Sequence, residues 1–191
     1  MSDLRGLDWY GEDLSGREHT GDAFWDGDLS EVTGTAATFT DCTFGGVRFN
    51  AARLTGSAFR SCTFTRCSFF AAELEECSFV GSRFTDCTLR PLTVRGGDWS
   101  FVSLVGQDLR GTTFDGVRLR EVDLTRADLS TAAVNGADLS GAELTDSTWT
   151  GADLRGSDLS AFDVREVALA GVRIRAEQAV TLAQALGLRI G

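Results

Sequence analysis

The hydrophobic residues of this chain follow a period of five. Every fifth residue from Phe39 to Ile174 is apolar, and the same phase continues less regularly toward the N-terminus through Leu29, Phe24 and His19. A period of five matches neither the 3.6-residue turn of a helix nor the two-residue alternation of a strand. The pattern therefore predicts a repeat architecture in which each unit of five residues, here called a quintet, adopts the same local structure.

The other positions of the quintet are equally selective. Two residues before each apolar centre, from Val32 to Val172, the side chain is small except at Leu92, Gln107 and Phe162. Most of the chain's 22 glycines lie two residues after a centre, where their tolerance of a positive φ favours a tight turn. Each quintet thus places one large and one small residue in an interior and turns once.

Short extended segments joined by such turns predict a solenoid. Its coils would stack like parallel strands, about 4.7 to 4.9 Å apart, so that each coil covers the apolar centres of the next. Burial of each large centre stabilises the fold by about 1.5 to 3 kcal/mol, and the ladder of centres can replace a globular core. Since the phase never slips, we expect one repeat domain over residues 1–175. A loop of five or ten residues around Gly34 would preserve the phase and stays possible.

Several quintets carry a recognisable motif. The stretches "ADLST", "ADLSG", "AELTD", "ADLRG" and "SDLSA" resemble the A-[DN]-L-x-x consensus of the pentapeptide repeat family. The stretches "LRPLTV", "DLRGTTFDGVRLREVDL" and "EQAVTLAQALGLRI" are similar, more particularly, to the mycobacterial fluoroquinolone-resistance proteins of that family. The resemblance implies an all-β fold, a right-handed quadrilateral β-helix with four quintets in each coil of twenty residues.

The last segment, residues 176–191, leaves the five-residue period. Ala179, Leu182, Ala183 and Leu186 recur there at helical spacing, and Gly187 is a suitable end for a helix. The open end of a solenoid exposes core and backbone edges, so we expect a short C-terminal α-helix that caps it. The resemblance also implies that a homodimer forms through this end.

The five cysteines, Cys42, Cys62, Cys67, Cys77 and Cys87, all occupy the small site two residues before a centre. A free cysteine behaves as a small hydrophobic residue, so we interpret all five as packing residues. Some of them lie twenty residues apart, close enough across neighbouring coils for a disulfide. We nevertheless expect reduced thiols in a cytoplasmic chain.

No constellation of residues points to catalysis, a cofactor or a metal. The single histidine, His19, sits at a centre position, where a core or cap role is expected, and no other histidine is available to activate a serine. The chain lacks a P-loop, a G-x-G-x-x-G stretch and a C-x-x-C pair. We therefore expect a protein that is not an enzyme and needs no cofactor.

The chain has neither a membrane helix nor a signal peptide that we can recognise. Apolar runs stay far below the roughly 18 residues that a spanning helix needs, and the N-terminal segment has no basic and apolar signal regions. We expect a soluble cytoplasmic protein.

Charge is the remaining signal. The 28 acidic residues outnumber the 18 arginines, for a net charge of -10, which argues against direct binding to nucleic acid. More than half of the acids lie immediately before a centre. Each of them could accept a hydrogen bond from nearby backbone and support a turn. With twenty residues per coil they also form two columns of candidate partner-binding residues: Asp98, Asp138 and Asp158, interrupted by Arg118, and Asp123, Glu143 and Asp163.

Such columns suggest a function in binding rather than in catalysis. A stiff acidic rod would offer regularly spaced anions to a cleft that normally holds a DNA duplex. The resemblance implies a DNA mimic that binds DNA gyrase, a type II topoisomerase, and inhibits it or protects it from fluoroquinolones. Inhibition and protection both stay open, as do the drug and the docking face. A pentapeptide scaffold that binds a different protein is the alternative, because a fold does not fix a function.

Overall fold

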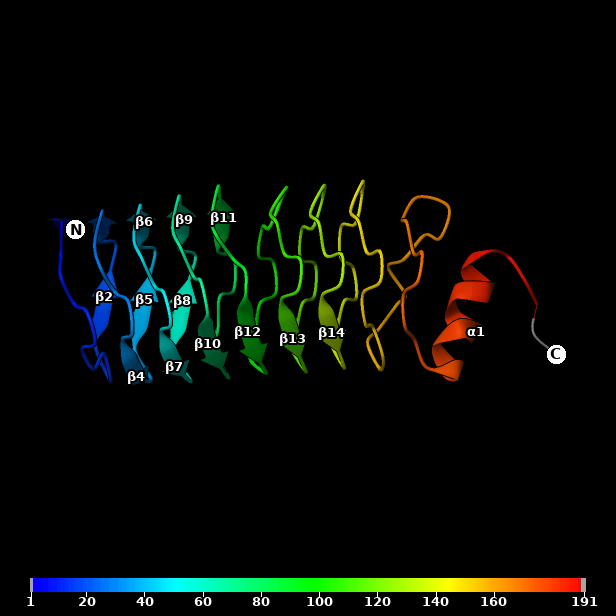
Figure 1. Ribbon diagram of the computed structural model, residues 1–191, viewed down its shortest axis with the longest axis horizontal. Helices are drawn as coiled ribbons and strands as arrows, with labels where there is room; N and C mark the ends of the chain where they lie inside the picture. Colours follow the sequence, from blue (N-terminus) through cyan, green and yellow to red (C-terminus); the bar gives the residue numbers. More distant parts are fainter. Residues whose placement is uncertain (1, 190–191) are drawn as a thin grey trace.

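The computed structural model describes residues 2–189, which form a rod of stacked coils with a helix at its C-terminal end (Figure 1). Short parallel strands pair so that each residue meets the one twenty positions later, as Phe24 meets Phe44 and Phe44 meets Phe64. One coil therefore takes four quintets, and the predicted four-sided β-helix with a C-terminal helix is confirmed. Residue 1, where the expected repeat domain begins, and residues 190–191, where the expected C-terminal segment ends, lie outside the described residues.

Each coil has four faces, which we name A to D in chain order. In one coil the centres Leu124, Leu129, Val134 and Leu139 belong to faces A, B, C and D.

Three faces contain the regular strands, and Figure 1 shows them side by side along the rod. Face A has the strands β1 (Asp3–Arg5), β3 (Ala23–Trp25), β6 (Thr43–Gly45), β9 (Thr63–Thr65) and β11 (Arg83–Thr85), in this order. Face C has β4 (Thr33–Thr35), β7 (Arg53–Thr55), β10 (Ala72–Glu75), β12 (Leu92–Arg95), β13 (Thr113–Asp115) and β14 (Ala133–Asn135). Face D has β2 (Glu18–Thr20), β5 (Thr38–Thr40) and β8 (Ala58–Arg60). Face B is joined by single bridges in the same register, such as Asp28 with Arg48.

The corners between faces adopt the left-handed conformation that the glycines predict. Gly136, for example, has a φ of 58°. The same conformation occurs at non-glycine corners such as Asp86, with a φ of 53°. The corner at Pro91 differs, and its peptide bond with Arg90 is cis.

No loop leaves the rod at Gly34, where the sequence left one possible. Thr33 bridges Asp13 of the preceding coil and pairs with Arg53 of the next. Both pairs are twenty residues apart, so the coil around Gly34 has the same length as its neighbours. A Cβ at Gly34 would lie 3.1 Å from the backbone nitrogen of Ser15, which explains why this centre has no side chain.

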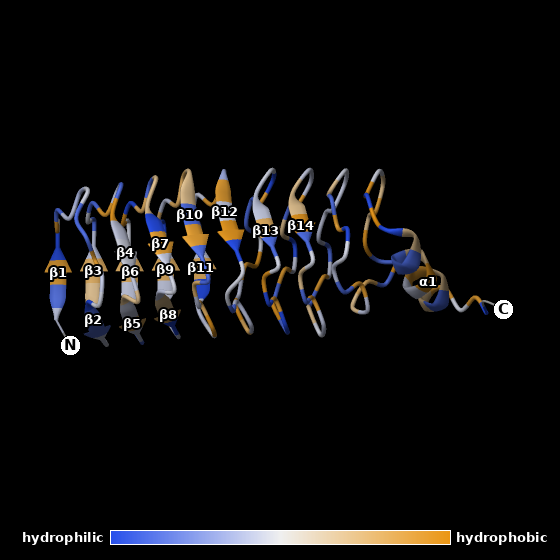
Figure 2. Cartoon of the chain, turned by 90° about the horizontal axis from the view of Figure 1, so that it is seen from below, coloured by the Kyte–Doolittle hydropathy of each residue, from blue (hydrophilic) through white to orange (hydrophobic). Residues whose placement is uncertain are grey.

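The core is a continuous ladder of the apolar centres. In the N-terminal half it consists of stacked phenylalanine rings: the ring centroid of Phe64 lies 4.9 Å from that of Phe44 and 4.7 Å from that of Phe84. Toward the C-terminus leucines such as Leu124 and Leu139 take over and are equally buried. Figure 2 shows hydrophobic and hydrophilic residues alternating along each coil, as the two inward positions of every quintet require.

The cysteines confirm their predicted role in packing. Cys42, Cys62, Cys67 and Cys77 are buried, Cys87 is half-buried, and all five thiols are free. His19 lies half-buried at a centre position of the N-terminal end, where its ring stacks on Phe39 at a centroid distance of 5.3 Å. Within the described part of the chain, no helix is long and apolar enough to cross a membrane.

Candidate partner-binding site

Apart from Asp3, whose carboxylate accepts from the Arg5 side chain, the aspartates that precede the centres make the same local contact. In each case Oδ1 accepts a hydrogen bond from the backbone N–H two residues later, which closes an Asx turn at the corner. This contact occurs at Asp8, Asp13, Asp28, Asp98, Asp108, Asp123, Asp128, Asp138, Asp153, Asp158 and Asp163. The structural explanation therefore holds for these aspartates, and a binding role has to rest on what the carboxylates do in addition.

The first predicted column lies on face D. Asp98, Arg118 and Asp138 bridge one another on successive coils. Asp158 continues the stack, since its N–H donates to the carbonyl of Ala137 at 2.9 Å. The sequence register thus brings these acids together as expected.

Arginines neutralise much of the face D column. Nη1 of Arg118 lies 2.9 Å from Oδ2 of Asp98, and Nε of Arg120 lies 3.3 Å from Oδ2 of Asp138. Asp158 is joined to no arginine by an ion pair within residues 2–189. The column is therefore a mixed stripe in which Asp158 keeps an uncompensated charge.

The second predicted column lies on face A and is shorter than expected. Asp123 bridges Glu143 in the next coil, and in the described range neither acid forms an ion pair with an arginine. Asp163 does not extend this ladder: its carbonyl accepts the N–H groups of Glu166 and Val167 in a local turn. Its carboxylate is held by Arg165, with Nε at 2.9 Å and Nη2 at 2.6 Å. The prediction of a three-residue column thus reduces to Asp123 and Glu143.

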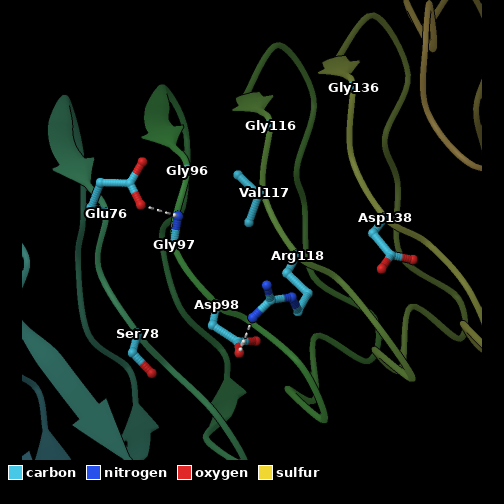
Figure 3. Close-up of a pocket in the computed structure, with 10 residues that line it drawn as sticks. All are labelled: Glu76, Ser78, Gly96, Gly97, Asp98, Gly116, Val117, Arg118, Gly136 and Asp138. Carbon is cyan, nitrogen blue, oxygen red and sulfur yellow. Dashed lines mark hydrogen bonds and ion pairs between the residues drawn. The ribbon is translucent and has the colours of Figure 1, made fainter.

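A groove runs along the edge between faces C and D. The corners Gly96, Gly116 and Gly136 have no side chains there, which leaves a hollow of about 500 Å³ (Figure 3). Asp98, Arg118 and Asp138 from face D line this hollow, together with Glu76 from the row of corners that Gly96, Gly116 and Gly136 continue. Oε2 of Glu76 accepts the N–H of Gly97 at 3.2 Å. The sequence did not single out Glu76, although it is the residue at the equivalent corner one coil before Gly96.

Two acids of face D, Asp98 and Asp138, are held in the ionised form. Burial alone would raise the pKa of Asp98, but hydrogen bonds from Ser100 and Arg118 outweigh it and lower the pKa below its usual value. The hydrogen bond from the Ser140 hydroxyl to Asp138 is the main cause of the lowered pKa of that carboxyl. Both groups therefore stay negative at neutral pH and well below it.

The C-terminal helix α1 (Ala176–Ala185) covers the open end of the rod. Its buried residue is Gln178, whose Nε2 donates to the carbonyls of Leu154 and Ser157, both at 2.8 Å. Its Oε1 accepts the N–H of Gly156 at 3.0 Å and that of Arg175 at 2.7 Å. One side chain thus satisfies the backbone groups that the last coil would leave unpaired. The sequence reasoning missed Gln178, although a glutamine in the first turn of a helix is a known capping signal.

The four residues predicted for the cap or dimer are distributed unevenly. Leu182 packs against the core, and Ala183 is half-buried beside it. Ala179 and Leu186 are exposed, as are Val180 and Leu188. The helix therefore uses one side to close the rod and leaves several apolar side chains uncovered.

Two family profiles match the repeats. The one described as "Pentapeptide repeat region" matches residues 37–114, and the one described as "Pentapeptide repeats (8 copies)" matches residues 100–133, 123–160 and 135–167. Together they cover most of the rod. The chain belongs to the pentapeptide repeat family.

Known pentapeptide repeat proteins share sequence and shape with this one. It is 43% identical over 99 residues to the pentapeptide repeat protein MfpA of Mycobacterium tuberculosis, a match that covers 52% of this chain and spans about half, 54%, of that relative. A trypsin-treated variant of QnrB1, a plasmid-mediated fluoroquinolone resistance protein, has the same fold with a TM-score of 0.59 and 22% identity over the full length of both chains. HetL, from the cyanobacterium Nostoc, matches with a TM-score of 0.55 and 18% identity over 89% of each chain.

This pentapeptide repeat rod contains no cluster of metal-ligating side chains. In the range 2–189, no group of three or more histidine, cysteine, aspartate or glutamate residues could hold a metal ion.

Proposed function

We propose that this pentapeptide repeat protein is a DNA mimic that binds DNA gyrase and thereby inhibits the enzyme, protects it from fluoroquinolones or other gyrase poisons, or does both. The observation that carries the proposal is the stack of uncompensated carboxylates, Asp123 and Glu143, in register on a rod with a net charge of -10. The resemblance to mycobacterial fluoroquinolone-resistance proteins supports gyrase as the partner.

The binding would be electrostatic docking without a chemical step. Asp123 is fixed by its Asx turn, so its carboxylate does not need to be ordered on binding. A basic cleft built for the regularly spaced phosphates of a duplex would attract such a rod, and charge complementarity would speed its association. The same excess of acid makes duplex DNA itself an unsuitable partner.

One observation favours the alternative, a scaffold for a different protein. Arginines pair with several of the acids, as at Asp98, Asp138 and Asp163, which makes the surface less like a phosphate backbone than the sequence suggested. A mixed surface of this kind is also typical of general protein interfaces.

A supercoiling assay with purified gyrase, with and without ciprofloxacin, tests the proposal. Wild-type protein at micromolar concentration should reduce supercoiling or reduce the DNA cleavage that the drug causes. The double variant Asp123→Asn, Glu143→Gln should need about 30-fold more protein for the same effect, if each of the two lost charges contributes about 1 kcal/mol. Asn and Gln keep an acceptor oxygen, so the Asx turn at Asp123 is retained.

A matched control removes the same number of charges elsewhere. Asp108 and Asp128 also bridge on successive coils, but on face B, and both pair with Arg110. The variant Asp108→Asn, Asp128→Asn should retain wild-type activity. If both double variants lose activity equally, net charge alone would explain the effect and the face A site would be wrong; if wild-type protein has no effect on gyrase, the alternative function is favoured.

The C-terminal end is proposed to join two copies of the chain. Val180, Leu186 and Leu188 are 40%, 55% and 58% exposed, and a two-fold contact between these ends would cover them and double the length of the rod. Sedimentation at micromolar concentration should show a dimer for the wild type and a monomer for Leu186→Asp. A monomeric wild type would contradict this proposal.

A further inference from the structure

An exposed phenylalanine stands on the edge between faces D and A. Phe101 is 56% exposed, and it occupies a corner with a φ of 60°. A bulky side chain is disfavoured in this left-handed conformation. Among the described non-glycine corners with a positive φ, it is the one aromatic residue; the others are Asp, Glu, Ala, Ser, Arg and Thr. Neither core packing nor backbone preference accounts for a phenylalanine at this position.

Phe101 separates two hollows, one on each side of the edge. On face D, a hollow of about 750 Å³ is lined by Phe101, Val80 and Ser100 among others. On face A, a hollow of about 500 Å³ is lined by Phe101, Val105 and Ser103 among others. Val80 and Val105 are half-exposed. Each lies directly after a centre, and the equivalent residues in the coil before it and in the coil after it are serine, threonine or arginine. We call the group of Val80, Phe101 and Val105 the Phe101 patch.

Charged side chains surround the Phe101 patch. Asp98 lines the hollow on face D, Asp123 lines the hollow on face A, and Glu121 lines both. Arg118 and Arg120 also border the face D hollow, where they pair with Asp98 at 2.9 Å and with Asp138 at 3.3 Å, and Arg83 borders the face A hollow. The edge therefore joins the two acidic columns, and an apolar group lies between them.

An apolar centre inside a charged rim is the arrangement of a protein-binding hot spot. The residues that contribute most to such interfaces are buried aromatic anchors, whereas charges at the rim mainly set orientation and association rate. Glu121 and Asp123, which form no ion pair with an arginine within residues 2–189, and the net charge of -10 fit a basic surface. A protein surface can provide an apolar pocket inside such a basic surround.

We propose that Phe101, flanked by Val80 and Val105, is the anchor that inserts into an apolar pocket of a protein partner whose surrounding surface is basic. This inference rests on the proposed function, because gyrase is the partner used to test it, and it adds an apolar contact to a surface otherwise explained by charge. The acidic columns orient the rod, and the Phe101 patch holds it in place.

The test compares Phe101→Gly with the wild type in the full-length protein. Thermal unfolding is followed for each protein, and its binding to purified gyrase is measured by titration and by the supercoiling assay. Glycine adopts a positive φ without strain, so the unfolding temperature of Phe101→Gly should stay the same or rise. Loss of a hot-spot anchor should weaken binding by about 30-fold or more.

Phe70 provides the matched control. It is 53% exposed and lies on face B, beside Arg90, Pro91 and Arg110. Phe70→Ala removes an equally exposed ring away from the acidic columns and should leave gyrase binding unchanged. Phe101→Ala provides a second truncation at the patch and should weaken binding like Phe101→Gly.

The possible results separate the two proposals. Binding of Phe101→Gly at wild-type strength overturns the anchor while the DNA-mimic proposal stands, and an equal loss for Phe70→Ala overturns the specificity of the site. If wild-type protein does not bind gyrase, the proposed function fails, and gyrase is excluded as the partner of the Phe101 patch. If the wild type is a dimer in sedimentation and Phe101→Gly is a monomer, the patch joins two copies of the chain, and the proposal of a partner pocket is overturned.

Discussion

Replacing Gly97 by alanine should destabilise the rod far more than the same replacement at Gly116. Both glycines have a positive φ, 83° at Gly97 and 64° at Gly116, so both variants carry the left-handed strain of an alanine. They differ in their surroundings. A Cβ on Gly97 would collide with the carbonyl oxygen of Cys77 in the preceding coil and lie 2.7 Å from its nitrogen, whereas nothing lies within 4 Å of a Cβ on Gly116.

The expected costs follow from these contacts. Left-handed strain costs about 1 kcal/mol for an alanine, and Gly116→Ala should show little more. At Gly97 the collision is with backbone, which cannot rotate away, and overpacking of this kind adds about 1 to 3 kcal/mol. Moving the coils apart would also lengthen the bonds from Asp98 N–H to Cys77 O, now 3.2 Å, and from Arg118 N–H to Gly97 O, now 3.1 Å; each contributes about 1 kcal/mol. We expect a total of about 3 to 5 kcal/mol for Gly97→Ala.

Thermal unfolding followed by circular dichroism measures the difference. A change of 1 kcal/mol shifts the Tm of a chain of this size by about 2 to 4 °C. Gly116→Ala should therefore lower the Tm by about that amount, and Gly97→Ala by at least about three times as much. Equal shifts for the two variants would refute the reasoning, since they would show that the spacing between coils gives way at no cost and that the glycine at 97 is not required by packing.

Three further predictions follow from the titratable and charged groups. The hydrogen bond from an arginine lowers the pKa of Asp28 to about 2, against about 3.9 in an unfolded chain. The stability that the ionised Asp28 contributes is therefore complete above about pH 4 and is lost as the pH falls toward 2. The free energy of unfolding measured with urea across this range should depend less on pH for Asp28→Asn than for the wild type. Burial raises the pKa of the Cys77 thiol to about 11, so a thiol reagent at pH 7.5 should modify the half-buried Cys87 first and Cys77 only after unfolding, as mass spectrometry can check. Because the pKa values of Asp98 and Asp138 are lowered, gyrase affinity measured between pH 5 and 8 should not change through these groups but should fall as salt is raised.

The fold could be predicted from the sequence because every rule that builds it is local and repeated. Each centre, small site and corner is specified within one quintet, and the register of twenty follows once four quintets close a coil. The presence or absence of a loop at Gly34 could not be predicted in this way, because an insertion of five or ten residues keeps the phase. The pairing of Thr33 with Asp13 and Arg53 decides it, and that pairing is a property of three coils together.

The site was harder to predict because acids that share a column in the register can differ in net charge once neighbouring arginines pair with some of them. The stacking of Asp98 with Asp138 followed from the register, but their neutralisation by Arg118 and Arg120 did not enter the prediction. Part of that information was present in the sequence: the pattern Asp-x-Arg, as at Asp163, places a guanidinium on the same face as the carboxylate it follows. The local turn that removes Asp163 from its ladder depends on the irregular last coil, which the five-residue rule does not describe.

Most acids of the rod are explained by the fold itself, and this narrows the search for its binding surface. An aspartate before a centre closes a corner whether or not a partner exists, so abundance of acid is not evidence of mimicry. What the fold does not require is that Asp123 and Glu143 should stack without an arginine between them, or that Phe101 should occupy a left-handed, exposed corner next to them. These features lie along the edge between faces D and A. The two features coincide on one edge, and this coincidence supports the proposal that a partner binds there.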